Sequence, residues 1–168
     1  MAHQPDRLTP KQQLFRDAMA NLSAGVNIVT TDGPGGRAGL TVSAVCSVTD
    51  TPPTMLVCVN RSSRSHDVFR ANERLCVNVL GTGHEDVAMA FAGRVAAEER
   101  FAVTRDVWDR SYGVPVLRGS AASVLGRVTG TVERGSHTVM FVEVDHVVPG
   151  QDGGGGLVYY RRGFHAVP

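Results

Sequence analysis

Valine dominates this chain, and residues that form turns interrupt it at short intervals. Of the 168 residues, 26 are valine, 19 are glycine and 8 are proline. Branching at Cβ favours extended backbone, whereas glycine and proline end strands and form the turns between them. The composition therefore predicts a fold made of many strands joined by turns.

Length and charge set the broad class of protein. A chain of this length forms one domain with a sizeable core, at about 100–200 residues per domain. Hydrophobic residues make up 42% of the chain and charged residues 20%, which is ordinary globular usage. We expect a single domain over residues 1–168, with residues 1–11 flexible. A formal net charge of +1 argues against nucleic acid as a partner.

The sequence gives no sign of a membrane or of an oxidising compartment. No apolar run approaches the ~20 residues that a membrane-spanning helix needs, and the polar N-terminus lacks the apolar stretch of a signal peptide. Cys46, Cys58 and Cys76 each sit in an apolar run, and their spacing fits neither a zinc site nor a disulfide framework. We expect a cytoplasmic protein with three reduced, buried thiols and no metal site.

Local signals divide the chain into a leading helix, about seven strands and two short helices. Thr9 and Gln12 form a capping box at the start of the leading helix, and apolar residues then recur at helical spacing. Short helices are predicted over residues 65–72, with Ser65 as N-cap, and after a second capping box over residues 82–91. The predicted strands cover residues 25–31, 38–48, 54–60, 74–80, 120–133, 137–148 and 157–160.

Long strands joined mainly by turns favour an antiparallel sheet. Seven of them in one domain most readily close into a barrel, because closure removes exposed edges. The glycine-rich residues 33–39 connect two strands, whereas a dinucleotide fingerprint connects a strand to a helix. The segment is therefore interpreted as a hairpin turn, and the expected fold class is mainly β with flanking helices.

Polar side chains occupy positions where strands are normally apolar. Thr41, Ser43 and Ser47 alternate through the second long strand, and Asn60 ends the third. The serines and arginines of residues 61–65 then lead straight into a helix. Hydroxyl, backbone N–H and guanidinium groups together suit a phosphate, although the same residues also suit a solvated helix cap. Both interpretations stay open.

Two glycine-containing motifs place a histidine after a turn, at Gly135-Ser136-His137 and at Gly163-Phe164-His165. Either histidine could border a site or face solvent. The sequence contains no GxSxG or HExxH motif and no obvious pair of carboxylates, so no catalytic side chain is assigned. Redox chemistry carried by a cofactor is compatible with this absence, and so is a binding module without activity.

Several segments of the chain match one known family. They are Phe15-Arg16-Asp17-Ala18-Met19, residues 24–31, 41–53, 75–80, 98–101 and 115–120, and Gly135-Ser136-His137. Together they resemble the short-chain flavin reductases, the small reductase components of two-component flavin monooxygenases. The resemblance covers about residues 12–166. Reductases that serve 4-hydroxyphenylacetate 3-monooxygenase are similar throughout, and those of a pyrimidine-degrading monooxygenase are even more similar over residues 32–38.

The resemblance implies a split β-barrel of the FMN-binding type, assembled as a homodimer. It implies direct hydride transfer from NADH or NADPH to FMN, FAD or riboflavin, without a protein nucleophile. The reduced flavin would then diffuse to a separate flavin-dependent monooxygenase. The alternative is a flavin- or haem-binding split-barrel module without enzymatic activity, since one fold hosts several functions.

The resemblance also implies a set of site residues. Those expected to contact the flavin are Asn27, Thr41, Val42, Ser43, Ala44, Ser47, Asn60, Ser62, Ser63, Ser65, Asn78 and Phe91. Within this set, Asn27 and residues 41–44 belong with the ring and ribityl chain, and the polar residues from Ser47 to Ser65 are candidates for the phosphate. The nicotinamide nucleotide is expected at His137, Phe164 and His165.

Overall fold

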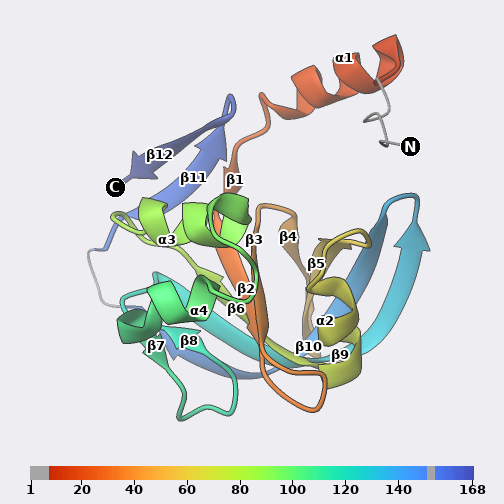
Figure 1. The fold of residues 1–168 in the computed structure, drawn as a ribbon. Helices are drawn as coiled ribbons and strands as arrows, with labels where there is room; N and C mark the ends of the chain where they lie inside the picture. The colour runs from red at the N-terminus through yellow and green to blue at the C-terminus, as the bar shows by residue number, and fades with distance from the viewer. Residues whose placement is uncertain (1–7, 151–153) are drawn as a thin grey trace.

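The computed structural model describes residues 8–150 and 154–168, which form a mainly β structure (Figure 1). The strands of its main sheet are β2 (Asn27–Thr31), β3 (Ala38–Val42), β4 (Val45–Asp50), β5 (Pro53–Asn60), β6 (Arg74–Val79), β9 (Ala122–Arg134) and β10 (His137–Pro149). β1 (Ala24–Gly25), β11 (Gly156–Tyr160) and β12 (Gly163–Val167) form a second sheet, and β7 (Trp108–Asp109) pairs with β8 (Val116–Leu117). The helices are α1 (Pro10–Met19), α2 (His66–Asn72), α3 (Glu85–Met89) and α4 (Arg100–Val103), with a π-helical turn at Ala90–Arg94 and a 3-10 turn at Arg105–Val107.

The two end strands of the main sheet are consecutive in the chain. The sheet runs in the order β3-β2-β6-β9-β10-β5-β4, and every neighbouring pair is antiparallel. Only residues 43–44 separate β3 from β4. Seven strands spaced about 4.8 Å apart in a flat sheet would hold these edges far from each other. The sheet therefore curves until its ends meet, which gives the predicted split barrel.

Alternating apolar side chains fill the barrel. On β5, Met55, Val57 and Val59 are buried, while the residues between them are only partly covered. Phe69 of α2 packs into the same cluster, and each such buried side chain contributes about 1.5–3 kcal/mol to stability. Asn72 at the end of α2 accepts a hydrogen bond from the N–H of Gly35 at 2.7 Å, which fixes the β2–β3 turn on the helix.

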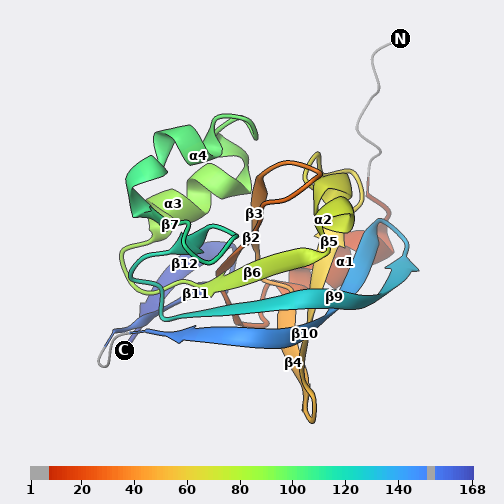
Figure 2. The ribbon, with the colours of Figure 1, turned by 90° about the horizontal axis from the view of Figure 1, so that it is seen from below.

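Three aromatic rings attach the segment between β6 and β9 to the barrel. Phe91, Phe101 and Trp108 lie with their ring centroids 5.0–5.4 Å apart, in edge-to-face and tilted arrangements. The three rings belong to one buried cluster with Ile28 of β2, which anchors the segment on the main sheet. Gly39 of β3 makes room for it, because a Cβ there would lie 2.6 Å from Phe91 Cε1. Figure 2 shows α3 and α4 gathered on one side, apart from α2.

Two predicted strands are each divided in the structure. Residues 38–48 form both β3 and β4, because the chain turns at residues 43–44. Residues 25–31 divide at Val26, whose N–H donates to the carbonyl of Leu157 at 2.9 Å and so ties the two sheets together. The residues at both breaks are also compatible with a continuous strand, so the residue pattern does not reveal the breaks. β12 has no counterpart in the sequence-based assignment.

The N-cap position is predicted correctly for α1 and α2 and wrongly for α3. The N–H of Thr9 donates to Gln12 Oε1 at 2.8 Å, and the N–H of Gln12 donates to Thr9 Oγ1 at 3.3 Å. Ser65 precedes α2 as expected, but its side chain makes no capping bond. The box expected from Thr82 does not form, because α3 begins after His84 instead. None of the helices within the described residues is both long and apolar enough to cross a membrane.

The three cysteines differ in burial. All are free thiols, as expected, and Cys76 is buried, which raises the pKa of its thiol to about 12. Cys58 is only half-buried and Cys46 is exposed. The expectation of three buried thiols is therefore wrong for Cys46, because β4 is an end strand of the sheet and its outer face is left uncovered.

Asn78 on β6 is wholly buried and joins three parts of the chain. Its amide N–H groups donate to the carbonyl of Ile28 at 2.9 Å and to Thr30 Oγ1 at 3.3 Å. Its Oδ1 accepts from the N–H of Leu117 at 2.8 Å and from the hydroxyl of Ser123 at 2.9 Å. The hydrogen-bonding capacity of this amide is used inside the protein. Asn78 is therefore a residue that holds the fold together, and its contact with the flavin stays a prediction.

We expect Asn78→Ala to lower the free energy of unfolding by about 3 kcal/mol, because it leaves several buried polar groups without a partner. Urea unfolding followed by circular dichroism measures the change. The control is Lys11→Ala at an exposed position of α1, which should stay within about 0.5 kcal/mol of the parent. Equal effects of the two substitutions would contradict this role of Asn78.

Candidate functional site

The end strands β3 and β4 meet without pairing, and we call this place the split of the barrel. The end of β3 borders a small cavity there, with a mainly apolar lining. Its volume is about 240 Å³. The residues around it are Val26, Thr41, Ser43, Met89, Ala92, Tyr159 and Phe164. Thr41 and Ser43 are predicted flavin residues, and Phe164 is a predicted nicotinamide residue. The structure thus brings residues from both predicted groups, far apart in the sequence, to one place.

The walls of this cavity are held by specific contacts. The hydroxyl of Thr41 donates to the carbonyl of Ala88 at 2.6 Å, which fixes β3 against α3. Tyr159 and Phe164 face each other across β11 and β12 and pack edge to face, with centroids 5.7 Å apart. An aromatic wall opposite a strand end that bears hydroxyl groups is the kind of lining that flat heteroaromatic ligands use.

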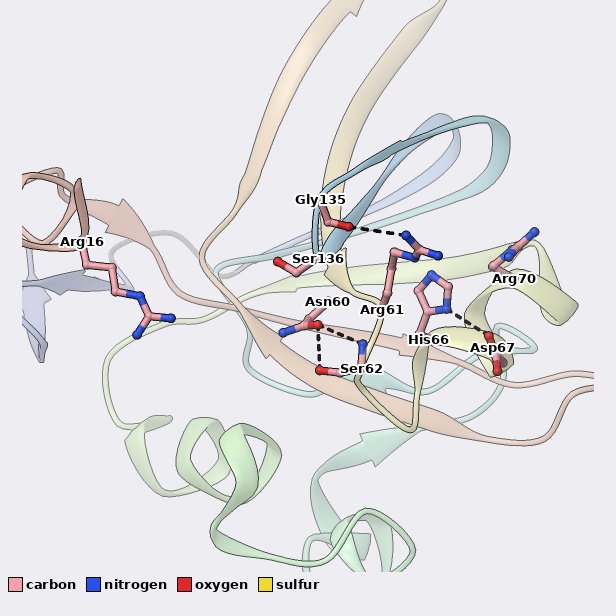
Figure 3. A pocket seen from close by; sticks show the side chains of 9 residues that line it. All are labelled: Arg16, Asn60, Arg61, Ser62, His66, Asp67, Arg70, Gly135 and Ser136. Atoms are coloured by element: carbon pink, nitrogen blue, oxygen red, sulfur yellow. Dashed lines mark hydrogen bonds and ion pairs between the residues drawn. The ribbon is translucent and has the colours of Figure 1, made fainter. Parts of the chain in front are cut away.

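The predicted phosphate residues divide between two other cavities. Ser63 and Ser65 border a cavity of about 420 Å³, together with Arg64 and Arg100. Asn60 and Ser62 border a second, larger cavity of about 630 Å³ (Figure 3). The loop after β5 therefore does not present one cluster of hydroxyl groups.

Arg100 connects the first of these cavities to the barrel. Its Nη1 donates to the carbonyl of Gly39 at 2.9 Å, and its Nε donates to the carbonyl of Val95 at 3.2 Å. Burial lowers the pKa of Arg100 from its ordinary value, but an arginine side chain stays charged. The hydroxyl of Ser63 accepts from the N–H of Ser65 at 3.3 Å. Guanidinium and hydroxyl groups in this arrangement suit a phosphate.

His137 lies beside the larger cavity. It opens β10 directly opposite Asn60 in the strand register, and its Nδ1 lies 2.9 Å from Ser136 Oγ. Asn60 Oδ1 accepts from both the N–H and the hydroxyl of Ser62, each at 2.9 Å. A predicted nicotinamide residue and two predicted phosphate residues are thus neighbours on the same side of the barrel.

Other predicted site residues lie elsewhere. Asn27 is buried, and its amide donates to the carbonyls of Gly25 at 3.0 Å and Val42 at 3.3 Å. Val42 and Phe91 belong to the two hydrophobic clusters. These side chains pack inside the protein, and their contacts with the flavin stay predictions.

Three further predicted residues are exposed. Ala44 follows Ser43 beside the split, and Ser47 lies farther along β4. His165 turns back on its own hairpin, with Nε2 3.0 Å from the carbonyl of Tyr160.

Sequence reasoning missed several residues around these cavities. Arg100 lies in the matching segment 98–101 and could have been found there. Met89 ends α3, and Ala92 lies in the π-helical turn that follows it. No signal in the sequence marks that turn.

The fold and the site together define a class of protein. The chain belongs to the family of the flavin reductase like domain, which matches residues 19–168. It is 50% identical over 161 residues to the 4-hydroxyphenylacetate 3-monooxygenase reductase component of Pseudomonas aeruginosa, covering 95% of this chain and 94% of that protein.

Two further proteins support the assignment of the chain to this family. The chain is 52% identical over 159 residues to the FMN reductase (NADH) RutF of Ancylobacter novellus, covering 93% of this chain and 85% of that protein. Among solved structures, the NADH:FAD oxidoreductase SgcE6 of Streptomyces globisporus superimposes with a TM-score of 0.83 at 26% identity, covering 98% of this chain and 99% of that one. The resemblance identified from sequence is confirmed.

Proposed function

We propose that this chain is an oxidoreductase that transfers hydride from NADH or NADPH to FMN, FAD or riboflavin. The reduced flavin then leaves for a separate monooxygenase. The observation that carries the proposal is the meeting of Thr41, Ser43 and Phe164 around one apolar cavity at the barrel split, in a chain of the flavin reductase family. The names of the two relatives, a monooxygenase reductase component and an FMN reductase (NADH), support it.

The residues around the apolar cavity fit a flavin. A flavin bound here would supply the ring that accepts the hydride. Tyr159 and Phe164 would exclude water from one side of that ring. Ser43 and Ala44 are exposed beside the cavity, so their hydroxyl and backbone groups are placed to bond to the polar edge of a ligand. No side chain is required to act as a nucleophile or to move a proton.

The cavity around Ser63, Ser65, Arg64 and Arg100 is the proposed site of the flavin phosphate. Arg64 Nη1 lies 3.8 Å from Glu98 Oε2, and both side chains are largely exposed. The guanidinium group of Arg64 can therefore turn towards a phosphate with little loss of free energy. We place the reaction in the cytoplasm, because exposed and half-buried free thiols such as Cys46 and Cys58 suit a reducing compartment.

The purified protein is expected to bleach the visible absorbance of FMN under anaerobic conditions when NADH is added. Ala92→Phe places a ring in the apolar cavity and should lower the rate at least about tenfold, which corresponds to ~1.4 kcal/mol. Ala102→Phe, on the exposed side of α4, adds the same ring away from this cavity and should leave the rate unchanged. No bleaching by the parent protein would reject the proposed function.

Substitution of Ser63→Ala together with Arg64→Ala tests the phosphate site. The affinity for FMN, measured by fluorescence titration, should fall roughly tenfold, since a charge-assisted hydrogen bond is worth about 1.5–3 kcal/mol. Riboflavin has no phosphate, so its affinity should stay within about twofold. Equal losses for FMN and riboflavin would contradict this assignment.

α1 and the turn after it carry an uncovered apolar face. Leu14, Phe15, Met19 and Leu22 are between 46% and 71% exposed, and none of residues 10–19 is buried. The helix stands away from the barrel (Figure 1) and is tied to the β11–β12 turn by an ion pair between Asp17 and Arg162. An apolar face held in a fixed position is typical of an interface between subunits. We propose a homodimer in which a second copy of the chain covers it.

Phe15→Ser should convert the dimer to a monomer at micromolar concentration, because it removes a large apolar side chain from the proposed interface. Size-exclusion chromatography with light scattering measures the mass. Lys11→Ser, on the same helix but at a charged position, is the matched control and should remain dimeric. A monomeric parent protein would overturn the proposal.

A further inference from the structure

The larger cavity beside Asn60 and Ser62 gathers three guanidinium groups. Its volume is about 630 Å³, and it is lined by Arg16 of α1, Arg61 of the loop after β5 and Arg70 of α2. Figure 3 shows Arg61 and Arg70 on one side with Arg16 set apart from them. Three cations around one space favour an anionic ligand.

Arg61 and Arg70 are held at this cavity by a shared partner. Arg61 Nη2 lies 3.4 Å and Arg70 Nη1 lies 4.0 Å from the carboxylate of Glu133. The N–H of Arg61 donates to the carbonyl of Ser136 at 2.8 Å, which fixes the loop on the β9–β10 hairpin. One carboxylate between two guanidinium groups leaves a positive surplus. Both arginines are half-exposed, so each keeps N–H groups open to a ligand.

The floor of the cavity is polar and rigid. His66 is buried, with Nε2 2.9 Å from Thr138 Oγ1 and Nδ1 3.0 Å from a carboxylate oxygen of Asp67. His66 therefore fixes the start of α2, which carries Arg70, on β10. Asp67 also lines the cavity with an almost fully exposed carboxylate. Three guanidinium groups thus face two carboxylates, those of Asp67 and Glu133, and a surplus of one positive charge remains.

Two features indicate which anion binds here. The cavity adjoins the Gly135-Ser136-His137 motif, where the nicotinamide nucleotide is expected. The loop after β5 also lines two separate cavities. Hydride transfer between a flavin nucleotide and a pyridine dinucleotide involves two substrates that carry phosphate, so each cavity can receive one of them. The smaller cavity at Ser63 and Ser65 is the one connected to β3 through Arg100, so it belongs with the flavin.

We propose that Arg61 and Arg70 form an anion subsite that binds the phosphates of the adenylate half of the pyridine dinucleotide. The loop after β5 then separates the two nucleotide tails, with the flavin phosphate on the Ser63 side and the dinucleotide phosphates on the Ser62 side. This inference rests on the proposed function, because it assigns the second substrate of that reaction to a place in the fold.

Binding of ADP, which carries only the adenylate half, tests the subsite without turnover. Isothermal titration calorimetry should show roughly tenfold weaker binding for Arg61→Ala/Arg70→Ala than for the parent. Arg61→Lys/Arg70→Lys keeps both charges and should retain most of the affinity. The matched control is Arg105→Ala, which removes an exposed arginine that pairs with Asp106 and should change nothing. Unchanged ADP affinity in the double alanine variant would overturn the proposal.

Kinetics distinguish the dinucleotide from the flavin. In the double alanine variant, the KM for NADH should rise roughly tenfold. Reduced nicotinamide riboside, a hydride donor without phosphate, should give the same kcat/KM as with the parent. A raised KM for FMN with an unchanged KM for NADH would assign the cavity to the flavin and overturn the proposal. If the parent binds ADP through these arginines but reduces no flavin, the proposed function fails and the anion subsite stands.

Discussion

The structure depends on one constraint, which is that the first and last strands of its main sheet are joined by two residues. β3 and β4 stand at opposite ends of the strand order, yet only Ser43 and Ala44 lie between them in the chain. The sheet has to curve back on itself to satisfy this connection, and hydrogen-bonded pairing stops where its ends meet. The apolar cavity lies beside this point, where backbone and hydroxyl groups remain available to a ligand.

The elements around the split complete the site. The second sheet supplies Tyr159 and Phe164, and the π-helical turn after α3 supplies Ala92. Both are attached to the barrel by buried interactions, the first through the backbone of Val26 and the second through the Phe91 cluster. The site is therefore built on rigid elements, which suits a reaction that requires orientation more than acid or base groups.

Much of the fold could be predicted from the sequence, because valine alternation and turn residues are local signals. The seven strand regions follow directly from them, and the cap of α1 follows from the capping box of Thr9 and Gln12. The break at residues 43–44 could not, since polar and small residues there are equally compatible with a continuous strand.

The candidate site was predictable in part. Thr41, Ser43 and Phe164 are singled out from the sequence, and the fold brings them to one cavity. Asn27 and Asn78 instead use their amides on buried backbone groups. A polar residue in a strand looks the same in sequence whether it faces a ligand or satisfies such groups. The division of the serine–arginine loop between two cavities depends on how α2 and the β9–β10 hairpin pack, which is a tertiary property.

The decisive measurement is a crystal structure of the protein with bound FMN. The flavin ring should lie in the apolar cavity against Ser43 and Phe164, with its phosphate at Ser63 and Arg64. A ring bound outside the barrel split, or a phosphate placed at Arg61 and Arg70, would contradict it.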